Sequence, residues 1–156
     1  MHNQTPKTAD ASNPEDARGS LASELRVAIR SAADIVAARQ AGRGLAMKLG
    51  FAAAEVTVIT AAISEIARNI VDHAQRGTMT MSGVHEGTKA GLLVIARDHG
   101  PGIPDVARAM EYGYSTGQRD GAGLPGAKWL MDEFDITSKP GKGTTVVMKK
   151  WLNRNG

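Results

Sequence analysis

Four short segments contain the residues of this sequence with the clearest capacity for chemistry. They are SEIARN at 64–69, DHGPG at 98–102, GAGL at 121–124 and GKGTT at 141–145. The first has helical periodicity, so Glu65 and Asn69, four residues apart, project from one face of a helix. A carboxylate and an amide oxygen placed in this way can handle a proton and hold a hydrated magnesium ion. A solvated helix face is the alternative for the same pair.

Asp98 ends an apolar segment that has the pattern of a buried strand, and glycines follow it. A buried carboxylate can accept a hydrogen bond from the exocyclic amine of adenine and reject a base with a carbonyl there. Gly100 and Gly102 would let the backbone approach the base, and Thr144 could reach the same base edge through water. The alternatives are an aspartate that only starts a turn and a threonine that is only a strand residue.

The GAGL segment opens a predicted helix. Helix N-termini present free backbone N–H groups and a positive dipole end to phosphates. Gly121 and Gly123 lack the side chains that would block a phosphate, and Arg119 just before them can add a positive charge. A glycine-rich hinge without a ligand is the alternative.

Three better-known nucleotide motifs are excluded. GAGLPG at 121–126 has the spacing of a dinucleotide fingerprint, but the polar segment before it lacks the pattern of the strand that this fingerprint requires. PGKGTT at 140–145 has its lysine before the second glycine, unlike a Walker A loop. The H-R-D and D-F-G motifs of the protein-kinase signature are also missing.

The elements that must position these segments follow from periodicity and from turn residues. Alternation predicts a strand over 25–30, and Ser31 is expected to cap the helix that follows, which Gly50 stops. A longer helix is expected over 53–74, ended by Gly77. Its apolar residues recur at helical spacing at Val56, Ile59, Ile63, Ile66 and Ile70.

The second half of the chain continues the alternation of strands and helices. Strands are expected over 78–86 and 91–98, a helix over 124–134, and a closing hairpin of strands over 135–138 and 144–152. This order predicts an α/β fold in the form of an α+β two-layer sandwich, with a mixed β-sheet covered by helices on one face. We expect a single domain over 21–156, preceded by a disordered polar tail over 1–20.

Composition excludes several functional classes. With no cysteine, the chain has neither disulfides nor thiolate chemistry. The net charge is +3, but the basic residues are scattered and 4% of residues are aromatic, so no nucleic-acid partner is expected. Residues 1–20 contain no apolar run, and the longest apolar stretch includes Glu65. We therefore expect no membrane segment and a cytoplasmic location.

Together, the four segments resemble the N, G1, G2 and G3 boxes of the GHKL superfamily of ATPases and kinases, which includes gyrase, Hsp90, histidine kinases and MutL and has the Bergerat ATP-binding fold. The residues that carry the resemblance are Glu65, Asn69, Asp98, Gly100, Gly102, Gly121 to Leu124, Gly143 and Thr144. Beyond that superfamily, the segment 98–144 is similar, almost position by position, to the RsbT-type serine/threonine protein kinases of bacterial stressosomes and partner-switching modules. This resemblance extends over 25–151.

The resemblance implies an ATP-binding site and a kinase activity. The implied nucleotide contacts are Asn69, Asp98, Gly100, Gly102, Arg119, Gly121, Ala122, Gly123, Leu124, Gly143 and Thr144. Glu65 is the implied catalytic residue, and Asn69 is the implied ligand of Mg²⁺. The expected substrates are STAS-domain antagonist or scaffold proteins, and a PP2C-type serine phosphatase is a further expected partner, bound and activated by the kinase.

Two alternatives stay open. One is an anti-sigma factor kinase that binds a sigma factor, and the other is a switch that uses nucleotide only to shape a binding surface. The presence of both Glu65 and Asn69 favours an enzyme. Pro125, within GLPG, favours the RsbT type over the anti-sigma relatives.

Overall fold

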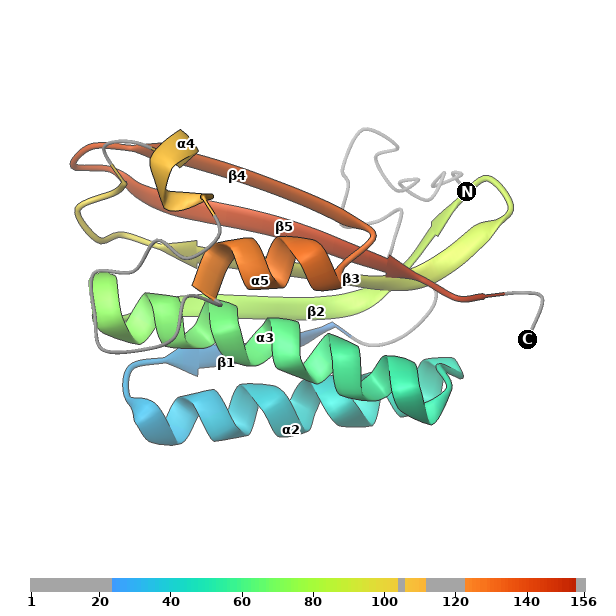
Figure 1. Cartoon of the computed structure of the whole chain (residues 1–156). Helices are drawn as coiled ribbons and strands as arrows, with labels where there is room; N and C mark the ends of the chain where they lie inside the picture. The colour runs from blue at the N-terminus through green and yellow to red at the C-terminus, as the bar shows by residue number, and fades with distance from the viewer. Residues whose placement is uncertain (1–23, 104–105, 112–122, 154–156) are drawn as a thin grey trace, which may run out of the picture.

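The computed structural model describes residues 24–103, 106–111 and 123–153. Its elements, drawn in Figure 1, are β1 (Leu25–Ile29), α2 (Ala32–Leu49), α3 (Ala53–His73), β2 (Gly77–Glu86), β3 (Lys89–Asp98), α4 (Val106–Ala109), α5 (Gly123–Leu130), β4 (Glu133–Lys139) and β5 (Gly143–Trp151). Each predicted strand and helix is present, and the short helix α4 is additional. The tail predicted over 1–20 lies outside the described residues.

The five strands form one sheet in the order β1-β2-β3-β5-β4, and every pairing is antiparallel. This corrects the expectation of a mixed sheet. β3 and β4 do run in the same direction, because the helix between them carries the chain back, but β5 lies between them and opposes both. The expected two-layer α+β architecture is confirmed.

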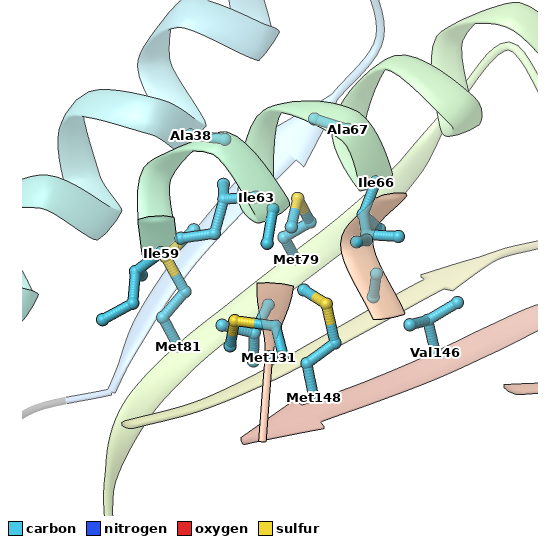
Figure 2. Close-up of a cluster of buried hydrophobic side chains, with 14 of the residues drawn as sticks. Ala38, Ile59, Ile63, Ile66, Ala67, Met79, Met81, Met131, Val146 and Met148 are labelled. Atoms are coloured by element: carbon cyan, nitrogen blue, oxygen red, sulfur yellow. The ribbon is translucent and has the colours of Figure 1, made fainter. Parts of the chain in front are cut away.

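Helices α2, α3 and α5 lie on one face of the sheet (Figure 1). The hydrophobic core fills the space between these helices and the sheet. The apolar positions of α3 that helical spacing predicts are all buried, with at most 4% of each residue exposed. They share this layer with Met79, Met81 and Met148 of the sheet (Figure 2). Burying one such side chain contributes about 1.5–3 kcal/mol, so this stripe does much to hold α3 on the sheet. No helix in the described ranges is long and apolar enough to cross a membrane.

Local hydrogen bonds set the ends of α2. Gly50 ends the helix as predicted, in a left-handed conformation with φ of 99°, and its N–H bonds to carbonyls of the last turn. Ser31 stands at the N-cap position, but its side chain makes no capping hydrogen bond. At this end the carboxylate of Asp34 accepts the backbone N–H of Arg30 at 2.8 Å instead.

The end of α3 differs from the expectation. The helix ends at His73, and Gly77, expected to stop it, is instead the first residue of β2, opposite Asp98. Between them, Gln75 has a positive φ of 71° in the turn that leads into the sheet. Gly77 therefore belongs to the end of the sheet where the predicted site lies.

Helix α5 is shorter than periodicity predicts. It ends at Leu130, and Phe134, expected in its last turn, is already part of β4. The chain joins the sheet here because the backbone N–H of Asp132 bonds to the carbonyl of Lys149 at 3.0 Å. The Asp132 carboxylate also accepts the backbone N–H of Trp151 at 2.7 Å. Tertiary pairing thus overrides the local helical pattern.

Candidate functional site

One residue from each of four neighbouring strands forms a row across the end of the sheet. Gly77 of β2 lies opposite Asp98 of β3, which lies opposite Thr144 of β5, which lies opposite Ser138 of β4. We call these residues the end row. Asp98 and Thr144 alternate with core residues along their strands and therefore point toward the helices. Directly opposed side chains on one face are close enough to interact.

Burial distinguishes Asp98 and Thr144 from other polar residues. In the described part of the chain the buried polar or charged residues are Ser82, Asp98 and Thr144, so two of the three are predicted site residues. Asp98 is 8% exposed and Thr144 5% exposed. A carboxylate at such a position is costly unless hydrogen bonds or a ligand satisfy it.

The hydrogen bonding of Asp98 is compatible with both roles considered for it. Its Oδ1 accepts the backbone N–H of Gly100 at 2.9 Å, so the residue does start a turn. That turn occupies one oxygen of the carboxylate. Among the described residues the other oxygen has no hydrogen-bond partner, and no unpaired side-chain oxygen there is fully buried. A ligand can therefore reach this oxygen.

Gly102 and Gly143 are required where the loop after β3 meets the turn between β4 and β5. Both have a positive φ, of 81° and 91°. A Cβ at Gly143 would collide with the carbonyl oxygen of Asp98, and a Cβ at Gly102 with that of Lys139. A hydrogen bond joins the two segments, from the N–H of Gly141 to the carbonyl of Pro101 at 2.7 Å. Both predicted glycines therefore shape the backbone around Asp98.

Gly77 is a site residue that sequence reasoning missed. A Cβ there would lie 2.5 Å from the carbonyl oxygen of Arg97, 3.0 Å from Cβ of Asp98 and 3.1 Å from Cγ2 of Ile70. Gly77 thus leaves room between the end of α3 and Asp98. The sequence does carry a signal for this role, a glycine at the start of a strand, but glycine is equally typical of the helix end predicted there.

Ser138 is the second residue that was missed. Its Oγ accepts the backbone N–H of Ile103 at 2.7 Å, lies 2.8 Å from Oγ1 of Thr144 and donates to the carbonyl of Gly143 at 3.2 Å. It therefore joins the loop after β3 to the start of β5. A signal was present in the sequence, since Ser138 continues the alternation of Phe134 and Ile136 toward the core.

The structure places the predicted pair in the second half of α3, which leads toward the end row. Glu65 and Asn69 are both half-buried and one helical turn apart. The end of α3 packs against the end row and its loop. The contact is so close that a Cβ at Gly100 would lie 2.5 Å from Cβ of Ala74. In the described part of the chain, no hydrogen bond engages the Asn69 amide, which leaves its oxygen available to a cation.

The predicted phosphate-binding segment is described only from its third residue onward. Gly123 is the first residue of α5, and this helix packs alongside α3 (Figure 1). Leu124 is 6% exposed and its side chain belongs to the core, so only its backbone could meet a phosphate. Arg119, Gly121 and Ala122 lie outside the described residues.

The residues present fit an adenine nucleotide and a hydrated magnesium ion. The unpaired carboxylate oxygen of Asp98, beside the Thr144 hydroxyl, matches an amine on the edge of a flat base. The glycines at 77, 102 and 143 keep side chains away from Asp98. Magnesium retains most of its water and needs few protein oxygens, which the Asn69 amide can supply.

Comparison with known proteins identifies the type of domain. Residues 27–150 match the family described as the histidine kinase-like ATPase domain. The serine/threonine-protein kinase RsbT of Bacillus subtilis is 52% identical over 119 residues, which cover 76% of this chain and 90% of that protein. The anti-sigma F factor of Caldanaerobacter subterraneus is 36% identical over 107 residues, which cover 65% of this chain and 73% of that protein.

The kinase relative thus matches this chain more extensively and at higher identity than the anti-sigma relative does. The five-stranded sheet with its single helical layer agrees with the matched domain type. The chain belongs to the RsbT-type serine/threonine-protein kinases of the histidine kinase-like ATPase family.

Proposed function

We propose that the chain binds ATP with its adenine at the end row and transfers the γ-phosphate to a serine or threonine of a STAS-domain protein. The observation that carries the nucleotide site is the buried Asp98, with one oxygen in the turn and the other available. That oxygen accepts the adenine amine, and Thr144 satisfies the same base edge directly or through water. The glycines around Asp98 let the base approach the backbone.

The phosphates extend from the base toward the start of α5 and the Glu65–Asn69 face of α3. Backbone N–H groups at the start of α5 bind them, with Arg119, Gly121 and Ala122 as further proposed contacts. Asn69 holds Mg²⁺, which neutralises phosphate charge when it is bound.

In the transfer step, the oxygen of the substrate hydroxyl bonds to the γ-phosphorus. The bond from that phosphorus to the bridging oxygen breaks, and ADP leaves. Glu65 orients the hydroxyl and takes its proton.

The proposed partners follow from the family. On the resemblance to the RsbT type, we propose a STAS-domain antagonist or scaffold as substrate and a PP2C-type serine phosphatase as the second partner, with phosphorylation as the switch between them in the cytoplasm. Trp129 on α5 offers a contact for such a partner, because it is 82% exposed and exposed aromatic residues often dominate interface energies. We expect Trp129→Ala to weaken the partner complex about tenfold or more while leaving ADP affinity unchanged.

The test is a transfer assay with the protein's own genome as the source of substrates. Purified chain is mixed with ATP, magnesium and each STAS-domain protein of that genome, and phosphate is located by mass spectrometry. The proposal predicts one modified serine or threonine, formed about a hundredfold or more slowly with Glu65→Gln. One control is the same reaction without magnesium. The other uses Asp135→Asn, which changes an exposed carboxylate on β4. No phosphate on any STAS-domain protein would contradict the proposed substrate class.

The anti-sigma relatives support a second candidate, in which the chain binds a sigma factor. A complex with a sigma factor that forms with ATP and is displaced by a STAS-domain protein would favour it. Nucleotide-dependent binding without any transfer would favour a switch that uses ATP only to shape a surface. The same purified components separate these outcomes by pull-down in ATP and in ADP.

A further inference from the structure

We infer that Ser138 sets the direction of hydrogen bonding at Thr144 and thereby makes the site selective for a base with an amine, not a carbonyl, at its six-position. The inference rests on the proposed nucleotide site. It adds a positioning residue on β4 that acts on the base through Thr144 without touching it.

The hydrogen bonds around Ser138 show which hydroxyl donates in the bond between Ser138 and Thr144. A serine hydroxyl has one proton and two lone pairs. The backbone N–H of Ile103, at 2.7 Å, can only donate and takes one lone pair. The carbonyl of Gly143, at 3.2 Å, can only accept and takes the proton. The second lone pair is then left for Thr144, whose hydroxyl oxygen lies 2.8 Å away and must be the donor.

This wiring uses every neighbour of the Ser138 hydroxyl. If Ser138 donated to Thr144 instead, the Gly143 carbonyl would lose the bond from Ser138. Polar groups in partly buried positions keep their hydrogen bonds where geometry allows, so the first wiring is the more stable one.

The consequence lies at the base edge. With its proton held by Ser138, Thr144 presents only lone pairs to a ligand, and the oxygen of Asp98 opposite it is also an acceptor. Two neighbouring acceptors suit the hydrogens of an amine, directly or through water. They repel a carbonyl oxygen, which finds no donor there. Without Ser138, the Thr144 hydroxyl could turn and donate to that carbonyl.

The test compares ADP with inosine diphosphate, which carries a carbonyl and an adjacent ring N–H in place of the adenine amine but has the same sugar and phosphates. Calorimetry gives the dissociation constant of each for the parent, Ser138→Ala, Ser138→Thr and Thr144→Val. Thr145→Val is the matched control, since it lies on the same strand but points to the other face of the sheet. Thermal unfolding of each variant establishes that it is folded.

We expect the parent to prefer ADP. Ser138→Ala should narrow the ratio of the two affinities about fivefold or more, the scale of one mispaired buried hydrogen bond. Ser138→Thr should restore the ratio, and Thr145→Val should leave it unchanged. Thr144→Val should also narrow it, which keeps the test decisive even where Ser138→Ala does not fold.

The possible failures are distinguishable. If Ser138→Ala weakens ADP and inosine diphosphate equally, Ser138 is only a structural brace for the loop after β3, and the inference is overturned. An unchanged ratio in Thr144→Val overturns it as well. If the parent itself shows no preference for ADP, the proposed placement of adenine at Asp98 fails, whatever Ser138 does.

Discussion

Replacing Asp98 by asparagine tests the nucleotide site directly, because the two oxygens of its carboxylate have different environments. Oδ1 accepts the backbone N–H of Gly100 at 2.9 Å, and an amide oxygen can keep that bond. The amide nitrogen must then take the place of the second oxygen. An acceptor that faced the adenine amine becomes a donor facing a donor, while the shape of the side chain stays the same.

The size of the effect follows from burial. Asp98 is 8% exposed, so water does not readily replace the lost hydrogen bond. A mispaired buried polar group costs about 1–3 kcal/mol, which corresponds to about 5- to 150-fold in the dissociation constant of ADP. Folding stability should change little because the bond to Gly100 survives. Asp98→Ala removes that bond as well and should lower the free energy of unfolding by about 0.5–1.5 kcal/mol.

Calorimetry with ADP and urea unfolding measure the two quantities separately. Inosine diphosphate tests the opposite change in affinity. The new side-chain amide of Asp98→Asn can donate a hydrogen bond to the carbonyl of its base, so the variant should bind inosine diphosphate more tightly relative to ADP than the parent does. Asp135→Asn, an exposed carboxylate on β4, is the matched control and should change neither affinity. A folded Asp98→Asn protein with parental affinity for ADP would refute the placement of adenine at this residue.

Three further predictions concern chemistry, packing and pH. Glu65→Gln should keep ADP affinity but slow transfer about a hundredfold or more, and Asn69→Ala should abolish magnesium-dependent transfer; a parental rate in Glu65→Gln would assign the proton elsewhere. Gly143→Ala should lower the free energy of unfolding by about 1–3 kcal/mol, because φ of Gly143 is 91° and a Cβ would collide with the carbonyl oxygen of Asp98. Urea titration measures this, and an unchanged unfolding midpoint would contradict the collision. The hydrogen bond from Lys149 to Glu86 raises the lysine pKa above its ordinary value of 10.5. The stabilisation by the Lys149–Glu86 pair is the difference in free energy of unfolding between the parent and Lys149→Met. This difference should be fully present below pH 10.5 and be lost as pH rises through the higher folded-state pKa of Lys149. A constant difference across that range would count against a stabilising pair.

Local sequence determined much of the fold and the chemical character of the site. The helical spacing of isoleucines in α3 is enough to predict both the helix and its buried face, because an apolar stripe of that period can be buried in only one way. A turn at Asp98 and Gly102 was predictable as well, since aspartate and glycine after a strand are typical turn residues. Gly143 came only from the resemblance to the GHKL boxes. The assignment of these residues to a nucleotide came from the resemblance of the four segments to known boxes.

The neighbours of these residues were decided only by the tertiary structure. Nothing local to 133–151 states that β5 inserts between β3 and β4, yet this insertion makes the sheet antiparallel and sets Thr144 between Asp98 and Ser138. The role of Gly77 depends in the same way on its pairing with Asp98. Register between strands distant in sequence is selected by the burial of whole faces, which short windows of sequence do not contain. The sequence therefore determined which residues can do the chemistry, and the pairing of the strands decided which of them meet.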